Sequence, residues 1–124
     1  MTKKNKITLG RRGEALAAEY LKKAGYRIVA CNFRNALGEI DIVARDGAIL
    51  CFVEVKTRSS DDFGGPAEAV SLFKQRKLIQ LARAFLKEQN LERTASRFDV
   101  VSVLIPAQGP VQIELIPDAF EAEE

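Results

Sequence analysis

Residues 38–58, GEIDIVARDGAILCFVEVKTR, decide the fold: they are two β-branched, apolar-rich runs joined by a turn at Asp46-Gly47. An Asp-Gly pair between such runs is a strong signal for a β-hairpin. Because side chains alternate along a strand, Glu39 and Asp41 share one face of the first strand, and Glu54 and Lys56 share one face of the second. Charges in this pattern are unusual for buried strands.

The register of this hairpin determines how close the acids come. If Asp46 and Gly47 form a two-residue loop, Asp41 faces Phe52 and Glu39 faces Glu54. Asp41 and Glu54 are then diagonal neighbours, with Cβ atoms roughly 7 Å apart. Two carboxylates at that separation can share a divalent cation; without one they repel, and the pKa of one rises. A three-residue loop with a bulge would break this geometry.

Length and composition indicate one globular domain over residues 1–124. Hydrophobic residues make up 47% and charged residues 29%, which is ordinary for a soluble protein. We expect no membrane association, because no apolar run is long enough to span a bilayer and residues 1–12 are not followed by the apolar segment of a signal peptide. We expect a cytoplasmic protein whose Cys31 and Cys51 are reduced and buried.

The residue types that are missing restrict the chemistry. The chain has no histidine and two cysteines, which excludes Ser-His and Cys-His catalysis and argues against a structural zinc site. Any catalysis must therefore use carboxylates, lysine or a metal ion.

Positive charge is concentrated in the first half of the chain. Residues 1–60 hold twelve Lys or Arg against six Asp or Glu, and residues 61–124 hold seven against eleven. We expect a flexible basic arm over residues 1–8 and an acidic tail over residues 118–124. The asymmetry is weak evidence for a polyanionic partner, since solubility alone explains scattered lysines.

Hydrophobic periodicity predicts two helices and five strands. The helices are expected at residues 11–23 and 71–89, with Ser71 as an N-cap, and the strands at residues 26–33, in the two halves of the hairpin, and at residues 97–105 and 111–116. A polar, glycine-rich loop is expected over residues 58–66. The order α-β-β-β-α-β-β indicates an α/β protein with a mixed sheet between helices.

The candidate site consists of Asp41, Glu54 and Lys56, with Glu14 and Gln75 as outer members. Two carboxylates and a backbone carbonyl, such as that of Val55, make an oxygen-rich site that suits Mg²⁺. A bound ion would polarise a phosphoryl oxygen and lower the pKa of a bound water. Lys56 would orient the water or offset charge that develops on the phosphate.

Simpler interpretations stand beside this one. Charges on adjacent strands can form a solvent-facing ion cluster, although Phe52 on the same face argues against a fully wet surface. Glu14 alone is typical of a solvated helix residue, and Gln75 alone of an exposed first-turn residue. Asp99 is most simply paired with an arginine such as Arg97 or held by backbone donors.

Four motifs together carry a resemblance to a known family. They are Gly13-Glu14-Ala15-Leu16-Ala17 on the first helix, Gly38 to Asp41, Phe52 to Arg58, and Arg97 to Val100. Over about residues 8–116 the chain resembles the YraN-like family of small bacterial proteins. That family is similar to the restriction-endonuclease-like, PD-(D/E)XK nuclease superfamily and to archaeal Holliday-junction resolvases.

The resemblance implies a fold, a site and an activity. The fold is a three-layer α/β/α sandwich with a central mixed β-sheet, restriction-endonuclease-like. The resemblance implies that Asp41 and Glu54 bind Mg²⁺ or Mn²⁺, that Lys56 is the catalytic lysine, that Glu14 is the acid of the first helix, and that Gln75 is the polar residue of the later helix. Small resolvase-like nucleases work as two-fold dimers, so a homodimer is also implied.

Two functions therefore remain open. One is a Mg²⁺-dependent endonuclease that hydrolyses DNA, including branched or damaged DNA. The other is a non-catalytic nucleic-acid-binding or assembly module on the same fold. In either case phosphate contacts, which carry no base information, are expected from basic side chains. These are Arg11, Arg12, Arg34, Arg58, Lys74 and Lys77.

Overall fold

The computed structural model describes residues 8–59 and 70–122 of the chain. The predicted basic arm up to residue 7, residues 60–66 of the loop predicted over residues 58–66, and the last two residues of the acidic tail lie outside the described residues. Residues 58 and 59 belong to a strand and not to that loop. In chain order the elements are α1 Leu9–Lys23, β1 Arg27–Asn35, β2 Gly38–Asp46, β3 Ile49–Ser59, α2 Leu72–Glu88, β4 Ser96–Ile105 and β5 Gln112–Phe120. This order is the predicted one, and the protein is α/β.

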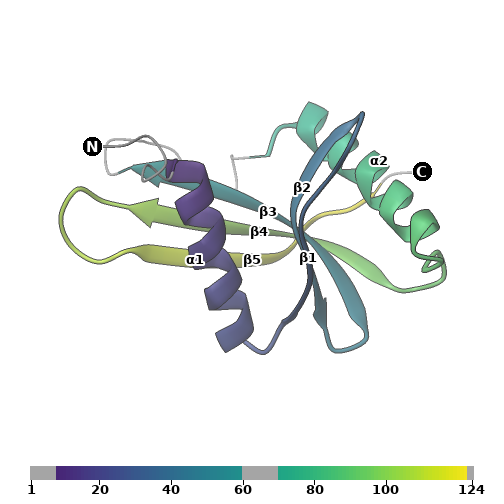
Figure 1. The fold of residues 1–124 in the computed structure, drawn as a ribbon, viewed down its shortest axis with the longest axis horizontal. Coiled ribbons are helices and arrows are strands. Elements are labelled where there is room, and N and C mark those ends of the chain that lie inside the picture. Colours follow the sequence, from purple (N-terminus) through teal and green to yellow (C-terminus); the bar gives the residue numbers. More distant parts are fainter. Residues whose placement is uncertain (1–7, 60–69, 123–124) are drawn as a thin grey trace.

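The five strands form one mixed sheet in the order β1-β2-β3-β4-β5 (Figure 1). β3 and β4 run parallel, and all other neighbouring strands are antiparallel. A parallel pair needs a long crossover connection, and the segment that joins β3 to β4 contains α2. β5 is an edge strand, as predicted, and β4 is buried along most of its length.

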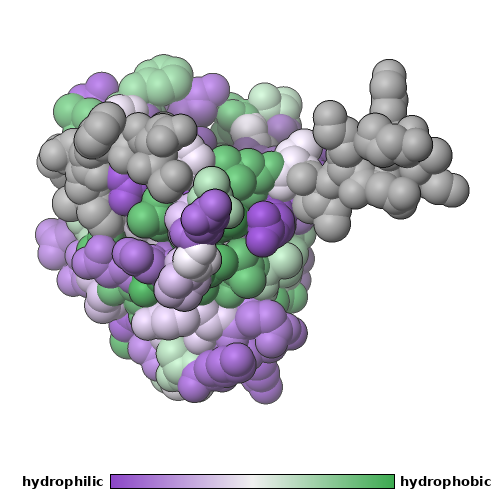
Figure 2. All heavy atoms as spheres, turned by 90° about the vertical axis from the view of Figure 1, so that its left-hand side faces the viewer, coloured by the Kyte–Doolittle hydropathy of each residue, from purple (hydrophilic) through white to green (hydrophobic). Residues whose placement is uncertain are grey.

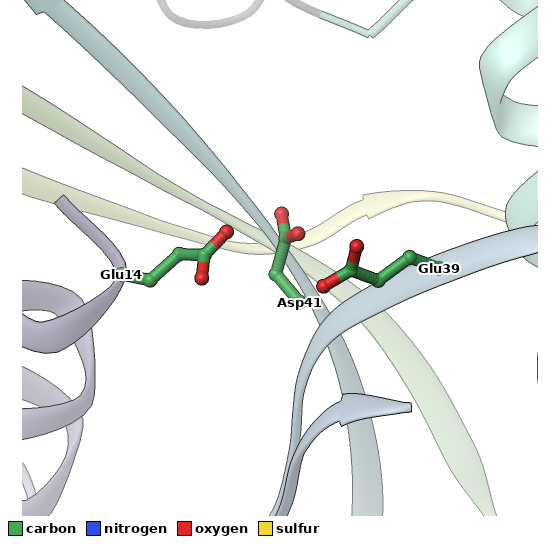
Figure 3. A group of neighbouring side chains, drawn as sticks. All are labelled: Glu14, Glu39 and Asp41. Carbon is green, nitrogen blue, oxygen red and sulfur yellow. The ribbon is translucent and has the colours of Figure 1, made fainter. Parts of the chain in front are cut away.

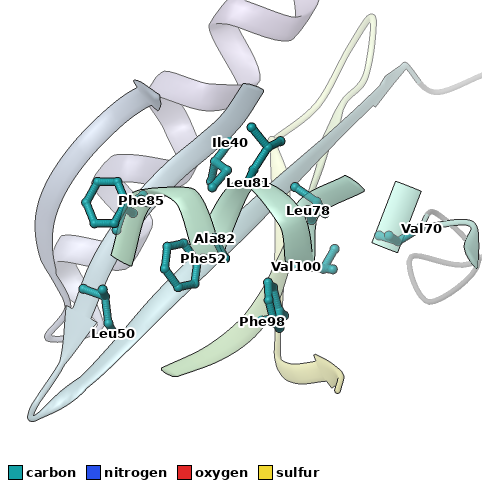
Figure 4. Packing of buried hydrophobic residues seen from close by; sticks show 11 residues of the cluster. Ile40, Leu50, Phe52, Val70, Leu78, Leu81, Ala82, Phe85, Phe98 and Val100 are labelled. Atoms are coloured by element: carbon teal, nitrogen blue, oxygen red, sulfur yellow. The ribbon is translucent and has the colours of Figure 1, made fainter. Parts of the chain in front are cut away.

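The two helices cover opposite faces of the sheet. Phe52 of β3 belongs to the apolar cluster that includes Phe85 of α2, whereas the next residue, Val53, belongs to the cluster that includes Leu21 of α1. Successive side chains of a strand point to opposite faces. On the α2 face, the ring centroids of Phe52 and Phe85 lie 5.8 Å apart in an edge-on arrangement (Figure 4). Phe52 is only 2% exposed, so its face of β3 is not a wet surface at that point.

Side-chain caps define the start of each helix. The predicted N-cap Ser71 is confirmed, because its Oγ accepts a hydrogen bond from the backbone N–H of Lys74 at 3.2 Å. Thr8 caps α1 in the same way through the N–H of Arg11, also at 3.2 Å. Residue 8 is therefore the N-cap of α1 and not part of a flexible arm, which corrects the predicted boundary. Such caps stabilise a helix by about 1 kcal/mol each.

The hairpin turn lies one residue after its predicted place, so each residue of β2 faces a partner on β3 two positions further along than predicted. Asp46 pairs with Ile49, which leaves Gly47 and Ala48 as the two-residue loop. Gly47 has a φ of 63°, a conformation that glycine adopts without steric cost. The prediction failed because Asp46 remains in the strand, where its carboxylate accepts a hydrogen bond from Arg97 at 3.1 Å. The parity of the side chains is unchanged.

Two further expectations are wrong. β5 continues to Phe120, whose ring stacks on Phe98 with centroids 4.8 Å apart, so the strand passes its predicted end at residue 116 and includes residues 118–120 of the predicted acidic tail. This contact connects residues distant in sequence, and a local pattern does not reveal it. Cys51 is buried, but Cys31 is exposed, because β1 is an edge strand with one open face.

A buried ionic network joins β2, β4 and β5. The Oδ1 atom of Asp99, which is 0% exposed, accepts hydrogen bonds at 2.9 Å from Arg97 Nε and from the backbone N–H of Asp118. The predicted arginine partner and the predicted backbone donor are both confirmed. The hydroxyl of Tyr26 donates to Asp99, and burial, followed by the charge of Asp99, raises the pKa of Tyr26. The network leaves Asp99 fully paired and gives it a structural role.

The surface charge follows elements rather than halves of the chain. α2 lies in the second half and still carries five Lys or Arg against one acid. From the side on which the β4–β5 connection lies, hydrophilic residues surround a smaller hydrophobic group near the middle (Figure 2). Within the described residues, neither helix has the length and apolar character needed to cross a bilayer.

Candidate metal centre

Three carboxylates from two elements converge beside the sheet. Glu14 of α1 and Glu39 and Asp41 of β2 each offer one carboxylate oxygen, and these oxygens lie within 4.8 Å of one another. All three side chains point toward a common centre and are partly buried (Figure 3). We call these three residues the acid group. Their separation is within the span of one cation with oxygen ligands, since Ca²⁺ and Mg²⁺ bind oxygen at about 2.0–2.6 Å.

A hollow of about 200 Å³ opens beside the acid group. Glu14 and Asp41 line it, so at least two of the carboxylates are accessible from it. Its other lining residues are Arg11, Ala15, Ala18, Cys31, Asn32 and Ile42. The hollow is large enough for an ion together with several waters, which matches the tendency of Mg²⁺ to retain water ligands.

Asp41 lies where β2 separates from β3. The pairing of the two strands runs from Asp46↔Ile49 to Ile42↔Val53 and goes no further toward Asp41. The Oδ2 atom of Asp41 instead accepts a hydrogen bond from the N–H of Val55 at 2.8 Å. The Asp41 carboxylate therefore accepts the hydrogen bond of a β3 backbone N–H that no longer pairs with the backbone of β2. This bond fixes the side chain at the point where the two strands separate.

The regular alternation of β2 also breaks at this point. Ile40 belongs to the apolar cluster under α2 and Ile42 to the cluster under α1, although they lie two positions apart in the strand. Regular period-two alternation would place both on one face. The break brings Glu39 and Asp41 to the α1 side, where Glu14 lies, and explains why Glu39 joins the acid group.

Glu14 reaches the group because α1 packs very closely on β3. A Cβ atom added to Gly13 would lie 1.8 Å from Thr57 Oγ1, so only glycine permits this approach. Glu14 is the next residue in the helix. The missing side chain of Gly13 thus lets α1 come close enough for the Glu14 carboxylate to reach the acid group. Glu14 is partly buried and is not the fully solvated helix residue of the simpler interpretation.

Asn32 holds two of the carboxylates together. Its Nδ2 donates hydrogen bonds to Glu14 Oε1 at 3.0 Å and to Glu39 Oε2, and its Oδ1 accepts from Arg11 Nη1 at 3.2 Å. The residue has a φ of 56°, in the left-handed region that asparagine tolerates better than most residues. Sequence reasoning missed Asn32, because nothing in the periodicity of β1 marks it.

Glu54 lies next to the acid group, with one oxygen that has no partner. The residue is 6% exposed, and its Oε2 lies 3.4 Å from Lys74 Nζ. Its Oε1 is buried and has no hydrogen-bond partner within the described residues. A buried carboxylate oxygen without a donor is costly, and a cation is one group that would satisfy it.

The electrostatics confirm that Glu54 and Asp41 are close neighbours. Burial, followed by the negative charge of Glu54, raises the pKa of Asp41 from 3.8 to about 8. The hydrogen bond from Val55 acts in the opposite direction, and the charges of Glu14 and Glu39 add to the rise. The charges of three other acids therefore act on Asp41, and near pH 8 this repulsion is relieved by a proton on Asp41 or by a cation.

Lys56 and Val55 occupy the expected strand positions. Lys56 follows Glu54 by two residues on β3 and is partly buried, and its side chain makes no hydrogen bond or ion pair within residues 8–59 and 70–122. No described side chain or backbone group therefore pairs with its ammonium. Val55 contributes its N–H to Asp41, and its carbonyl as a metal ligand remains a prediction.

Gln75 is not brought to the acid group. Its Nε2 donates to the carbonyl of Val70 at 3.1 Å, at the start of α2. The side chain lines a different hollow, of about 290 Å³, between α2 and Glu121. The hollow is lined by Leu72, Gln75, Arg76, Ile79, Gln80, Arg83 and Glu121.

The predicted phosphate-binding side chains occupy different environments. Arg34 pairs with Glu39 at 3.5 Å, Lys74 with Glu54, and the Nζ of Lys77 donates to the carbonyl of Leu37 at 3.3 Å. Arg12 is exposed at the start of α1. Arg58 lines a separate hollow between β3, β4 and β5.

Comparison with known proteins places the whole described core in one group of relatives. Residues 13–103 match the family model for "Uncharacterised protein family UPF0102". The chain is 50% identical to a UPF0102 protein of Geobacter metallireducens over 114 residues, which cover 92% of this chain and 93% of that protein. It is 48% identical over 117 residues to one of Caldicellulosiruptor saccharolyticus, covering 94% and 99% of the two chains.

Proposed function

The chain belongs to the uncharacterised protein family UPF0102, and from the site of this member we propose that it is a Mg²⁺-dependent nuclease that hydrolyses phosphodiester bonds in DNA. The proposal includes a restriction-endonuclease-like, three-layer α/β/α sandwich, in which each outer layer is one helix. One observation carries it: Glu14, Glu39 and Asp41 converge within 4.8 Å of one another, and Asp41 also lies close to Glu54, whose buried Oε1 accepts no hydrogen bond within the described residues.

The donor set fits a hard divalent cation. Carboxylate oxygens are the ligands that Mg²⁺ and Mn²⁺ prefer, and the hollow next to Glu14 and Asp41 provides space for waters. Asp41 and Glu54 would bind the ion, with Glu14 and Glu39 as direct or water-mediated ligands. When bound, the ion polarises a phosphoryl oxygen and acidifies a bound water.

The chain's own residues would perform the remaining tasks. Lys56 presents an ammonium that no described residue engages, so it would hold a phosphate oxygen or the attacking water and offset developing negative charge. Arg11 and Arg34 flank the acid group through Asn32 and Glu39, and would position phosphates beside it. Gln75 donates a hydrogen bond to the carbonyl of Val70, so its role would be to stabilise the start of α2 and not to contact the reacting atoms.

A panel of nucleic acids tests the activity. The protein is incubated with linear duplex, single-stranded, flapped and four-way DNA, and with RNA, in Mg²⁺, in Mn²⁺ and in EDTA. We expect cleavage of at least one DNA in the presence of metal and none in EDTA. Binding that weakens with salt, with no cleavage of any substrate, would instead support the non-catalytic nucleic-acid-binding module.

A conservative variant of Glu39 links the activity to this site. Glu39→Gln keeps the side-chain size and removes one charge, so we expect Mn²⁺ affinity, measured by calorimetry, to fall at least about tenfold. The metal concentration that gives half-maximal cleavage should rise in parallel. The matched control is Glu19→Gln on α1, where the exposed Glu19 pairs with Lys22 at 3.6 Å. Equal metal affinity for the two variants would remove Glu39 from the site.

A further inference from the structure

We propose that Phe73 and Lys77 form a platform on which an unpaired base of the nucleic acid stacks beside the acid group. The inference rests on the proposed function and refines its substrate class. The preferred substrate then has unpaired nucleotides next to the phosphate that is cleaved, as at a flap, a single-stranded end or an open junction.

Phe73 is an aromatic side chain on the surface of α2. It is 68% exposed, more than the other exposed large hydrophobic residues of the described chain. The Nζ of Lys77, one helical turn later, lies 5.5 Å from the centroid of its ring. A ring with an ammonium at one side and open space around it can accept a base by stacking, and the ammonium is available for the adjacent phosphate.

The contacts of the neighbouring residues place this ring beside the acid group. Lys74 follows Phe73 directly and reaches Glu54 at 3.4 Å. Lys77 donates to the carbonyl of Leu37, which precedes Glu39 by two residues. Phe73 is therefore followed on α2 by two lysines, one that reaches Glu54 on β3 and one that reaches the turn before β2, so a stacked base would leave its phosphate close to the strands that carry the acids.

The charge around Phe73 indicates a polyanionic occupant. α2 has no acidic residue in its first turn, and Lys74, Arg76 and Lys77 surround the aromatic position. A nucleic acid offers both a phosphate for these cations and a flat apolar base for the ring. A second copy of this chain would bring another basic α2 to the same surface, and like charges would oppose that contact.

A tryptophan reporter tests the platform directly. The chain contains no tryptophan, so Phe73→Trp introduces a single indole at the proposed contact. The probes are a 12-nucleotide oligo-dT, a blunt 12-base-pair duplex and the same duplex with a single-stranded overhang, all in EDTA. We expect quenching by oligo-dT and by the overhang at lower concentration than by the blunt duplex. Phe73→Trp should bind oligo-dT at least as tightly as the unsubstituted protein.

Truncation variants supply the control. Phe73→Ala should weaken oligo-dT binding at least about fivefold and change blunt-duplex binding less than about twofold. Leu72→Ala, the exposed neighbour, should change neither. Unchanged oligo-dT affinity in Phe73→Ala, or an equal loss for the duplex, would overturn the platform. The platform would also be overturned if Phe73→Ala converted a dimer to a monomer in sedimentation and left the preference for oligo-dT over the blunt duplex unchanged.

These measurements separate the two proposals. Binding is read in EDTA, so quenching by oligo-dT stands even where no substrate is cleaved in Mg²⁺, and only the nuclease assignment then fails. Conversely, metal-dependent cleavage with equal rates for Phe73→Ala and the unsubstituted protein on overhang DNA leaves the nuclease intact and refutes the platform.

Discussion

Asp41→Asn is expected to abolish metal-dependent cleavage. The same substitution should raise the free energy of unfolding of the metal-free protein at pH 8 and above. Cleavage should fall by about a thousandfold or more, since removal of a single group that stabilises transition-state charge already costs about 10²–10³ and Asp41 would also hold the ion. Asparagine can still accept the hydrogen bond from Val55, so the junction of β2 and β3 should persist.

The stability gain follows from the raised pKa of Asp41. Burial and the charge of Glu54 raise that pKa from 3.8 to about 8, so between these pH values the folded state holds a proton that the unfolded state has lost. The free energy of unfolding therefore falls as pH rises through this window, and the loss is complete above about pH 8. Asparagine carries no charge, so the variant escapes this loss.

Thermal melts in EDTA from pH 4 to pH 9 measure the effect. The free energy of unfolding of the variant should increasingly exceed that of the unsubstituted protein as pH rises. The difference should reach on the order of 1–3 kcal/mol at pH 9 after allowance for partial solvent contact, which corresponds to several degrees in Tm. Mg²⁺ at pH 8 should stabilise the unsubstituted protein and leave Asp41→Asn unchanged. A difference between the two proteins that does not vary with pH would contradict the assigned environment of Asp41.

Gly13→Ala is expected to destabilise the protein and to weaken its metal affinity together. The added Cβ would lie 1.8 Å from Thr57 Oγ1 and 2.7 Å from Thr57 Cβ. Rotation of Thr57 does not move its own Cβ, so α1 must move away from β3. We expect a loss of about 2–3 kcal/mol, since overpacking costs typically 1–3 kcal/mol or more and alanine recovers up to about 1 kcal/mol of helix propensity. The displaced Glu14 should lower Mn²⁺ affinity.

Two comparison variants make the steric cause testable. Gly10→Ala lies in the same helix with nothing within 4 Å of the added Cβ, so it should be neutral or slightly stabilising. Thr57→Gly removes the obstructing atoms, and in combination with Gly13→Ala it should cost less than the sum of the two single changes. If Gly13→Ala melts like Gly10→Ala, the close packing of α1 on β3 is not what positions Glu14.

Local pattern was sufficient for the elements and insufficient for their exact ends. Hydrophobic periodicity, of 3.6 residues for the helices and two for the strands, predicted the seven described helices and strands in order, because burial of one face dictates such patterns. The turn was misplaced by its Asp-Gly signal, since Asp46 is retained in β2 by Arg97, which lies fifty-one residues away. The stacking of Phe120 on Phe98 is equally non-local.

The site was partly readable for the same reason. Asp41, Glu54 and Glu14 are neighbours as expected, and Glu39 had a visible signal, because it shares the period-two face of Asp41. Asn32 had none, since its bridge depends on a left-handed residue on a strand that must first pair with β2. The ion pair of Lys74 with Glu54 was also hidden, because it depends on where the crossover helix comes to rest on the sheet.

The most direct measurement is X-ray diffraction from crystals of the protein soaked in Mn²⁺, with data collected for the anomalous signal of manganese. A single anomalous peak should lie among the carboxylates of Asp41, Glu54, Glu14 and Glu39, with Asp41 and Glu54 as direct ligands. A well-diffracting Mn²⁺ crystal with no peak among these four residues, or with its peak elsewhere on the molecule, would contradict the shared metal site.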